Sequence, residues 1–312
     1  NKRPARGLRH RLERAEDAMA PARKDDPDAA AALQRQDPRA ALTARYLHDY
    51  GPMPVCGGTA AKYYPDGQSM FADMLPALQG AQHSIYVESF IIGMGEMWGQ
   101  IHEILRRKAA AGLDVRVIYD DAGCLSLLPH NYAEMMRADG IRAFSFNRCV
   151  PMLNLVMNNR DHRKIMVIDG QIAFTGGVNL ADEYINKIVR FGYWKDSGVR
   201  LVNDLLSCLR FFFNGWVYLV IYTPGVPDKP TIYQLTRSYF PHLLRAGVKI
   251  YSYTPGFLHA KTWLVDDRIA AVGTVNLDYR SLYLHFENSV LLYGGAVLDD
   301  VRRDLAEIEK ES

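Results

Sequence analysis

Short runs of apolar residues alternate with longer amphipathic segments through most of the chain, a pattern that predicts strands separated by helices. Met97–Ala111 has apolar residues at spacings of three and four and is predicted as a helix, as is Asn131–Ala138. Around these helices lie four predicted strands: Ile85–Ile92, Val115–Tyr119, Arg142–Phe146 and Ile165–Ile168. This strand–helix rhythm indicates an α/β fold.

Part of the same order returns in the second half of the chain, which indicates an internal duplication. Its predicted elements are Val217–Tyr222, the helix Tyr233–Leu244, Lys249–Tyr253 and Thr262–Val265. Nothing there corresponds to Ile85–Asp114. Either this copy has lost a strand and a helix, or a segment near residues 214–217 is missing from the chain. We favour the second alternative, because loss of a core strand would leave an open sheet edge.

Three segments follow from this pattern. Residues 1–48 form a basic, Ala- and Asp-rich N-terminal helical segment, residues 49–204 a first half, and residues 205–312 a shortened second half. The most apolar window, Leu205–Tyr222, is long enough to raise the question of a membrane span. Polar residues and a glycine interrupt it, so we interpret it as a helix followed by a buried strand.

Composition narrows the possible partners. Lys+Arg 37 against Asp+Glu 35 leaves a net charge of +2, so a chain-wide field for gripping nucleic acid is absent. The stretch Lys2–Arg14 is nevertheless strongly basic. It is interpreted either as a solvated helix start or as a polybasic segment against anionic lipid headgroups. The four cysteines lack C-x-x-C spacing, so neither a zinc site nor a disulfide framework is predicted.

The most specific feature is the pattern H-x-K-x4-D-x6-G-x-x-N, which occurs twice. Its members are His162, Lys164, Asp169, Gly176 and Asn179, then His259, Lys261, Asp266, Gly273 and Asn276. We predict that each histidine and lysine lie on a strand, where residues two apart point to the same face. The aspartates follow at an odd offset, so we assign them a structural role. The glycines allow close backbone approach, and the asparagines can donate to phosphate oxygens.

These residues can move a phosphoryl group without a metal or other cofactor. One neutral histidine attacks phosphorus and the other, protonated, donates its proton to the leaving alcohol, while lysines and asparagines stabilise the charge. Each histidine needs a carboxylate on its far ring nitrogen. Glu287 and Asp196 are the candidates, each downstream of its motif and beside a short strand. The other histidines are interpreted as structural or surface residues: His83, His102, His130, His242 and His285.

Four strings surround these motifs: NNRDHRKIMVIDGQIAFTGGVNLADEYIN (Asn158–Asn186), YWKD (Tyr193–Asp196), PGFLHAKTWLVDD (Pro255–Asp267) and GTVNLDYRSLYLHFEN (Gly273–Asn288). In them the chain resembles the phospholipase D superfamily and, within it, the bacterial cardiolipin synthases. The resemblance covers most of residues 60–295. It implies two pseudo-symmetric halves, each a mixed β-sheet flanked by helices, with the active site at their interface.

The resemblance also implies a reaction. A phosphatidyl group would pass between two phosphatidylglycerol molecules, giving cardiolipin and glycerol through a phosphatidyl-histidine intermediate, with no metal and no nucleotide. Family roles fall on His162, Lys164, Asn179, His259, Lys261 and Asn276, with Glu287 and Asp196 orienting the histidines. By analogy His162 is the nucleophile and His259 the acid, or the reverse. The implied partners are phosphatidylglycerol and anionic lipids of the bacterial cell membrane.

The chain departs from the family pattern in the membrane-spanning helices, in the short spacing between its two motifs and, mildly, at Thr274. Members of the family commonly carry membrane-spanning helices ahead of the catalytic body, and none is predicted here. The basic stretch Lys2–Arg14 stands where such helices would have ended, which favours a truncated chain. Thr274 replaces the more usual serine and keeps the hydroxyl.

Three other functions stay open. A hydrolase would resolve the same intermediate with water and release phosphatidic acid. A nucleic-acid phosphodiesterase predicts a basic, aromatic-lined groove, against which the near-neutral charge argues. A catalytically inactive lipid-binding module is disfavoured by the two intact motifs. A lipid also needs an apolar approach, for which the candidates, each equally explained as core, are Leu125–Pro129, Met152–Met157 and Tyr239–Leu244.

Overall fold

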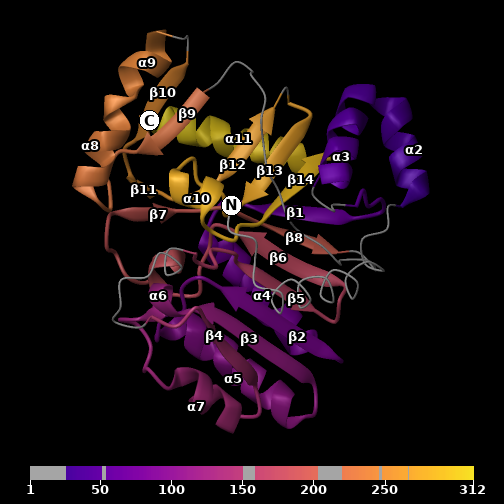
Figure 1. The fold of residues 1–312 in the computed structure, drawn as a ribbon, viewed down its shortest axis with the longest axis vertical. Helices are drawn as coiled ribbons and strands as arrows, with labels where there is room; N and C mark the ends of the chain where they lie inside the picture. The colour runs from indigo at the N-terminus through magenta and orange to yellow at the C-terminus, as the bar shows by residue number, and fades with distance from the viewer. Residues whose placement is uncertain (1–25, 51–53, 150–158, 203–219, 246–247, 266) are drawn as a thin grey trace, which may run out of the picture.

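A mixed seven-stranded sheet forms the first half of the molecule (Figure 1). The computed structural model describes residues 26–50, 54–149, 159–202, 220–245, 248–265 and 267–312. β2, β3 and β4 run parallel to one another, and the other neighbouring strands are antiparallel. The strand order is β1 (Ala60–Tyr64), β8 (Gly198–Val202), β6 (Ile172–Gly176), β5 (Ile165–Ile168), β2 (Ser84–Ser89), β3 (Asp114–Asp120) and β4 (Arg142–Phe146).

Helices complete this half: α4 (Gly67–Gly80), α5 (Glu96–Ala110), α6 (Asp121–Cys124), α7 (Tyr132–Ala138) and the 3₁₀ helix η3 (Asp182–Ile185). α5 packs against β3 and buries an apolar stripe at helical spacing that includes Trp98 and Ile101. Gly95 offers this helix no side-chain cap. Asp182 of η3 replaces the cap by accepting hydrogen bonds from the backbone N–H groups of Glu96 (2.9 Å) and Met97 (2.8 Å).

The second half repeats this plan with fewer strands. β12 (Thr262–Val265), β13 (Ile269–Gly273) and β14 (Ser289–Tyr293) form an antiparallel sheet that matches β5, β6 and β8. β9 (Val220–Pro224) and β10 (Lys249–Tyr253) are parallel, like β3 and β4. The helices are α8 (Pro230–Ser238), α9 (Phe240–Arg245), α10 (Tyr279–Tyr283) and α11 (Val297–Lys310). The predicted α/β fold of two related halves is confirmed.

The duplication is incomplete where the sequence predicts it. In the first half β2 joins β5 to β3, making one continuous sheet. Among the described residues no strand takes the place of β2 between β12 and β9, and the second half is therefore split into a three-stranded and a two-stranded sheet. The predicted break near residues 214–217 lies outside the described residues, as does the boundary between 204 and 205, so both stay predictions.

Most predicted elements lie close to their expected bounds, and two differ. The strand predicted over Ile85–Ile92 ends at Ser89, because the backbone N–H of Ile91 is taken by the Asn179 side chain. Tyr233–Leu244 forms two helices rather than one, since Pro241 lacks the N–H needed inside a helix and lies at the start of α9. Most of Leu205–Tyr222 lies outside the described residues. No described helix has the length and apolarity needed to cross a membrane.

The two halves share a hydrophobic core. Tyr63, Val199 and Leu201 of the first half pack with Val272 and Val290 of the second, beneath α11. Asp304 of α11 joins the halves further, because it accepts hydrogen bonds from Lys195 Nζ (2.6 Å) and Tyr63 Oη (2.7 Å). This buried contact fixes how the halves face each other.

The described part of the N-terminal segment is helical, as predicted, and contacts the second half. It consists of α2 (Pro27–Gln36) and α3 (Pro38–Tyr50) (Figure 1). Between them, Asp37 forms an ion pair with Arg268 (3.1 Å) and a hydrogen bond with Tyr293 (3.3 Å). The basic stretch Lys2–Arg14 lies outside the described residues.

Asp169 holds the turn between β5 and β6, in agreement with its predicted structural role. Its backbone is left-handed (φ 53°), and its carboxylate accepts hydrogen bonds from three consecutive backbone N–H groups, those of Gln82, His83 and Ser84 (2.7–2.8 Å). These bonds secure the entry to β2. Asp266 lies outside the described residues.

Asp169→Ala should lower the free energy of unfolding by about 1–3 kcal/mol, since three backbone donors lose a charged acceptor. Chemical denaturation measures this, and kcat/KM below the melting temperature should stay near wild type. The matched control is Asp267→Ala, which also removes an aspartate with positive φ (55°) but breaks only an exposed ion pair with Arg302. Equal destabilisation by both substitutions would contradict the role given to the Asp169 carboxylate.

Candidate active site

The two motif histidines lie just before their strands, not on them as predicted. His162 and Lys164 precede β5, and His259 and Lys261 precede β12. The reason is their backbone pairing. The N–H of His162 donates to the Phe286 carbonyl (2.9 Å), and that of His259 to the Lys195 carbonyl (2.7 Å), so each segment pairs with the opposite half.

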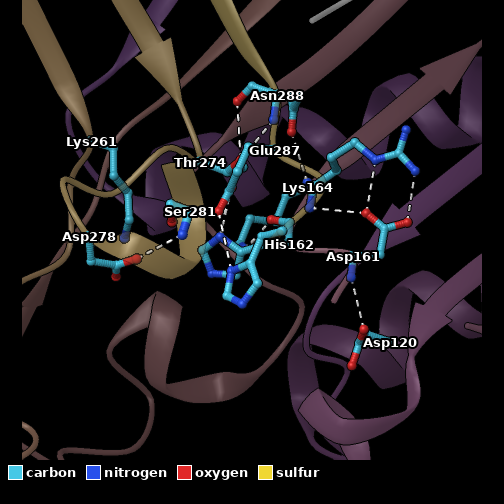
Figure 2. Close-up of polar contacts among 12 residues, drawn as sticks. Asp120, Asp161, His162, Lys164, Lys261, Thr274, Asp278, Ser281, Glu287 and Asn288 are labelled. Atoms are coloured by element: carbon cyan, nitrogen blue, oxygen red, sulfur yellow. Dashed lines mark hydrogen bonds and ion pairs between the residues drawn. The ribbon is translucent and has the colours of Figure 1, made fainter. Parts of the chain in front are cut away.

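Each histidine meets a carboxylate from the other half of the chain. His162 Nδ1 lies 2.8 Å from Glu287 Oε2, and His259 Nδ1 lies 2.7 Å from Asp196 Oδ2. Each carboxylate follows the motif of its own half in the sequence, so sequence order does not reveal this crossed pairing. Figure 2 shows the first of the two pairs.

Short parallel strand contacts create both pairs. β7 (Tyr193–Lys195) pairs with β11 (Gly256–Leu258), bringing the next residue of each, Asp196 and His259, side by side. An isolated parallel bridge between Asp161 and Phe286 does the same for His162 and Glu287. The same local geometry therefore occurs twice: once for the histidine of the first half and once for the histidine of the second half.

The predicted glycines permit this packing. A Cβ added to Gly176 would lie 2.3 Å from the Ser197 carbonyl oxygen, and one added to Gly273 would lie 2.3 Å from the Asn288 carbonyl oxygen. Close backbone approach, predicted for both, is confirmed.

Both motif lysines are buried, each beside its own motif histidine. Lys164 Nζ donates to the His162 carbonyl (2.6 Å), and Lys261 Nζ donates to the His259 carbonyl. Burial lowers the pKa of Lys164 to about 7 and that of Lys261 to about 8; the two ammonium groups also repel each other, and the site carboxylates oppose the decrease. An anion entering the site would favour protonation of both.

The two histidines are neutral in the empty site. Burial, together with the nearby lysines, lowers the pKa of His162 to about 3 and that of His259 to about 4. Burial opposes ionisation of Asp196 and Glu287, but their histidine partners keep both pKa values below the usual range. A carboxylate accepts only, so Nδ1 of each ring carries the proton and Nε2 keeps its lone pair.

The motif asparagines occupy different environments. Asn179 is buried, and its Oδ1 accepts the backbone N–H of Ile91 (3.0 Å), which fixes the amide. Asn276 is half-buried and lies just before α10. Donation by either amide to a phosphate stays a prediction.

Sequence reasoning missed Asn288 and the role of Thr274, which hold Glu287 and the segment around it in place. Thr274 Oγ1 donates to Glu287 Oε2 and accepts the backbone N–H of Asn288 (3.0 Å). The Asn288 side chain accepts the backbone N–H of Lys164 (3.2 Å; Figure 2). It also donates to Thr175 Oγ1. Thr274 directly follows the motif glycine Gly273 in the sequence.

His285, predicted to be a structural or surface residue, lies beside the site. Its ring centroid lies 5.5 Å from that of His162, and its Nδ1 lies 3.5 Å from Glu287 Oε1. His285 and Glu287 are two residues apart on an extended segment, which brings both side chains to the site. By contrast, His102 of α5 forms an ion pair with Asp139 away from the site. His83 and His130 are exposed.

The comparisons agree with this geometry. The sequence model of the family described as "Cardiolipin synthase, PLD-like domain" matches residues 74–189 and 196–308, one match for each half. The chain belongs to this family. Its place in the phospholipase D superfamily, predicted from the repeated motif, is confirmed.

Two of three curated relatives carry the same family name. A cardiolipin synthase of Halalkalibacterium halodurans is 31% identical over 343 residues, which cover 84% of this chain and 68% of the relative. An uncharacterised protein of Streptococcus mutans is 38% identical over 360 residues, covering 90% of this chain and 78% of the relative. A cardiolipin synthase of Alkalihalophilus pseudofirmus is 31% identical, and the chain spans 66% of its length.

A solved structure shares the fold. The phosphatidylserine synthase of Haemophilus influenzae superposes with a TM-score of 0.58 at 14% identity, covering 80% of this chain and 86% of that one. This likeness supports the arrangement of two related halves.

The lysine pKa values predict a pH dependence. Below their pKa values both lysines are cationic and able to bind a phosphate. As pH rises through about 7 to 8 they lose their protons, so kcat/KM of the free enzyme should fall. Log kcat/KM should descend with a slope approaching about −2 for two ionisations. Lys261→Arg, which stays charged, should reduce this slope to about −1. A flat profile between pH 7 and 9 would contradict the prediction.

Proposed function

We propose that the chain is the catalytic body of a cardiolipin synthase, which transfers a phosphatidyl group from one phosphatidylglycerol to another and releases glycerol. The observation that carries the proposal is the crossed pair of histidine–carboxylate contacts, with two buried lysines beside them. Family membership and the names of the relatives narrow the chemistry to phospholipids.

The proposed first step is attack of His162 Nε2 on the phosphorus of phosphatidylglycerol. The phosphorus–oxygen bond to glycerol breaks as the phosphorus–nitrogen bond forms. His259, protonated once the anionic lipid raises its pKa, gives its proton to the departing glycerol oxygen. Lys164 and Lys261 balance the charge on the non-bridging oxygens, joined by the amides of Asn179 and Asn276.

In the second step a hydroxyl of another phosphatidylglycerol enters. His259, now neutral, takes its proton, and the oxygen attacks the phosphatidyl-histidine to release His162. The protonation states return to those of the start.

The assignment of nucleophile and acid has structural support. The His162 side chain is 9% exposed and that of His259 is 17% exposed. A general acid must exchange protons with its surroundings, whereas the nucleophile must stay neutral. The more deeply buried His162 suits the second requirement.

An apolar surface beside the site supports a lipid substrate. Between Asn276 and Glu287 five large apolar or aromatic side chains are exposed: Leu277, Tyr279, Leu282, Tyr283 and Phe286. Aromatic side chains of this kind suit the interface between water and lipid. Of the predicted approaches, Leu125–Pro129 and Tyr239–Leu244 also expose leucine or tyrosine, and Met152–Met157 lies outside the described residues. We infer that this face meets the bacterial cell membrane.

The main alternative is a hydrolase that yields phosphatidic acid, because water and an alcohol can resolve the same intermediate. The near-neutral net charge of the chain argues against a nucleic-acid phosphodiesterase. An inactive lipid-binding module would have no use for two intact histidine–carboxylate pairs.

The purified protein should convert phosphatidylglycerol in mixed micelles to cardiolipin and an equal amount of glycerol, without CTP. Mass spectrometry of the lipids and a glycerol assay measure both products. Phosphatidic acid alone would replace the synthase with the hydrolase, and binding without turnover would favour the inactive module.

The two histidines should fail differently when replaced. His162→Ala should reduce kcat by at least about 10³-fold, since the covalent route is lost. His259→Ala should reduce it by about 10²–10⁴-fold with the glycerol leaving group, and a phosphatidyl donor with a better leaving group should recover much of the loss. The exposed His130→Ala is the control. If His162→Ala rather than His259→Ala regained activity with this donor, His259 would be the nucleophile and His162 the acid.

A further inference from the structure

Three buried polar atoms next to the proposed nucleophile make no hydrogen bond of good geometry within the described part of the chain, although two of them form a long ion pair of 3.5 Å. They are Ser281 Oγ, His285 Nδ1 and Glu287 Oε1. The Glu287 side chain is only 6% exposed and that of His285 12%. Buried polar atoms are nearly always paired, so a group of unpaired ones points to a bound water or ion.

Glu287 stands between two histidines. Its Oε2 lies 2.8 Å from His162 Nδ1, and its Oε1 lies 3.5 Å from His285 Nδ1. One donor atom from each of these three residues lies within 4.8 Å of the others. Two donors bound to one tetrahedral zinc ion at about 2.0–2.2 Å lie about 3.3–3.6 Å apart. Side-chain shifts of up to about 1 Å, including a lengthening of the 2.8 Å contact between His162 and Glu287, would bring all three donors onto one ion.

The other histidine–carboxylate pair lacks this feature. Asp196 Oδ1 accepts the backbone N–H of Ser197 (2.8 Å), and Oδ2 is shared by His259 and the Trp194 indole (3.3 Å). Both of its oxygens are therefore satisfied. Among the described residues of the site, the buried polar atoms that lack a good hydrogen bond therefore lie on the His162 side.

We propose that His162, His285 and Glu287 form an inhibitory site for Zn²⁺. Two imidazoles and one carboxylate are a donor set that suits zinc, whereas Mg²⁺ and Ca²⁺ prefer oxygen ligands. Because the zinc site includes the proposed nucleophile, the effect of zinc on turnover rests on the proposed function. The existence of the zinc site does not.

Metal binding at this position would disable the nucleophile through its tautomer. In the free enzyme Nδ1 of His162 carries the proton and Nε2 has the reactive lone pair. Zn²⁺ on Nδ1 needs the lone pair there, so the single ring proton must move to Nε2. The ring stays neutral and no proton is gained or lost, but Nε2 can no longer attack phosphorus.

The site can be tested without turnover. The purified protein is titrated with ZnCl₂ in competition with a chromogenic zinc chelator. We expect one equivalent bound by the wild type and an affinity at least about tenfold weaker in His285→Gln. The matched control is His102→Gln. Like His285, His102 has a buried ring nitrogen in an ion pair with a carboxylate (Asp139, 3.3 Å), but it belongs to no such three-donor group among the described residues.

Turnover is then measured with and without ZnCl₂, each variant relative to its own metal-free rate. Zinc should inhibit the wild type and His102→Gln, and inhibition of His285→Gln should need at least about tenfold more zinc. Millimolar MgCl₂ should not inhibit.

Absence of zinc binding, or equal binding by His285→Gln, would overturn the site and leave only water there. Binding without inhibition would overturn the tautomer mechanism. Because the chelator titration needs no substrate, failure of the proposed lipid reaction would not be mistaken for failure of the metal site.

Discussion

The crossed histidine–carboxylate pairing is the interaction on which the rest of the site depends. Neither half of the chain holds a complete pair, since His162 is oriented by Glu287 and His259 by Asp196. Each imidazole would otherwise be free to turn, and each buried carboxylate would lack its main partner, at a cost of several kcal/mol. The shared core and the contacts of Asp304 therefore act on the chemistry indirectly, by keeping the two halves in register.

Charge balance explains how this arrangement can be both buried and reactive. With neutral histidines, the two lysines and the two carboxylates of the site cancel. Their burial holds the lysine pKa values near 7 and 8 and the histidine values near 3 and 4. A phosphodiester adds one negative charge, which favours protonated lysines and one protonated histidine. The substrate thus creates the acid that its own cleavage requires.

Much of the fold was predictable because local patterns and tertiary structure agree. The strands at Arg142–Phe146, Ile165–Ile168, Lys249–Tyr253 and Thr262–Val265 have the predicted bounds. The repeat revealed two related halves and where the second lacks an element. Sequence spacing also drew attention to the residues that the fold gathers around His162 and His259.

What sequence reasoning missed is set by contacts between segments distant along the chain. The histidines lie outside their strands because their backbone pairs with the opposite half, and no local pattern encodes that choice. The crossed carboxylates follow from the same pairing. His285 gave no motif signal, and its position becomes informative only once Glu287 is seen to lie between two imidazoles.

The most direct test of the account is to find which residue carries the phosphatidyl group during turnover. Phosphatidylglycerol with a labelled phosphate is mixed with enzyme, quenched within milliseconds under alkaline conditions that preserve phosphohistidine, and the protein is digested and sequenced by mass spectrometry. The account predicts label on His162, none in His162→Ala, and accumulation when the acceptor alcohol is withheld. Label on His259, or turnover without any labelled histidine, would contradict it.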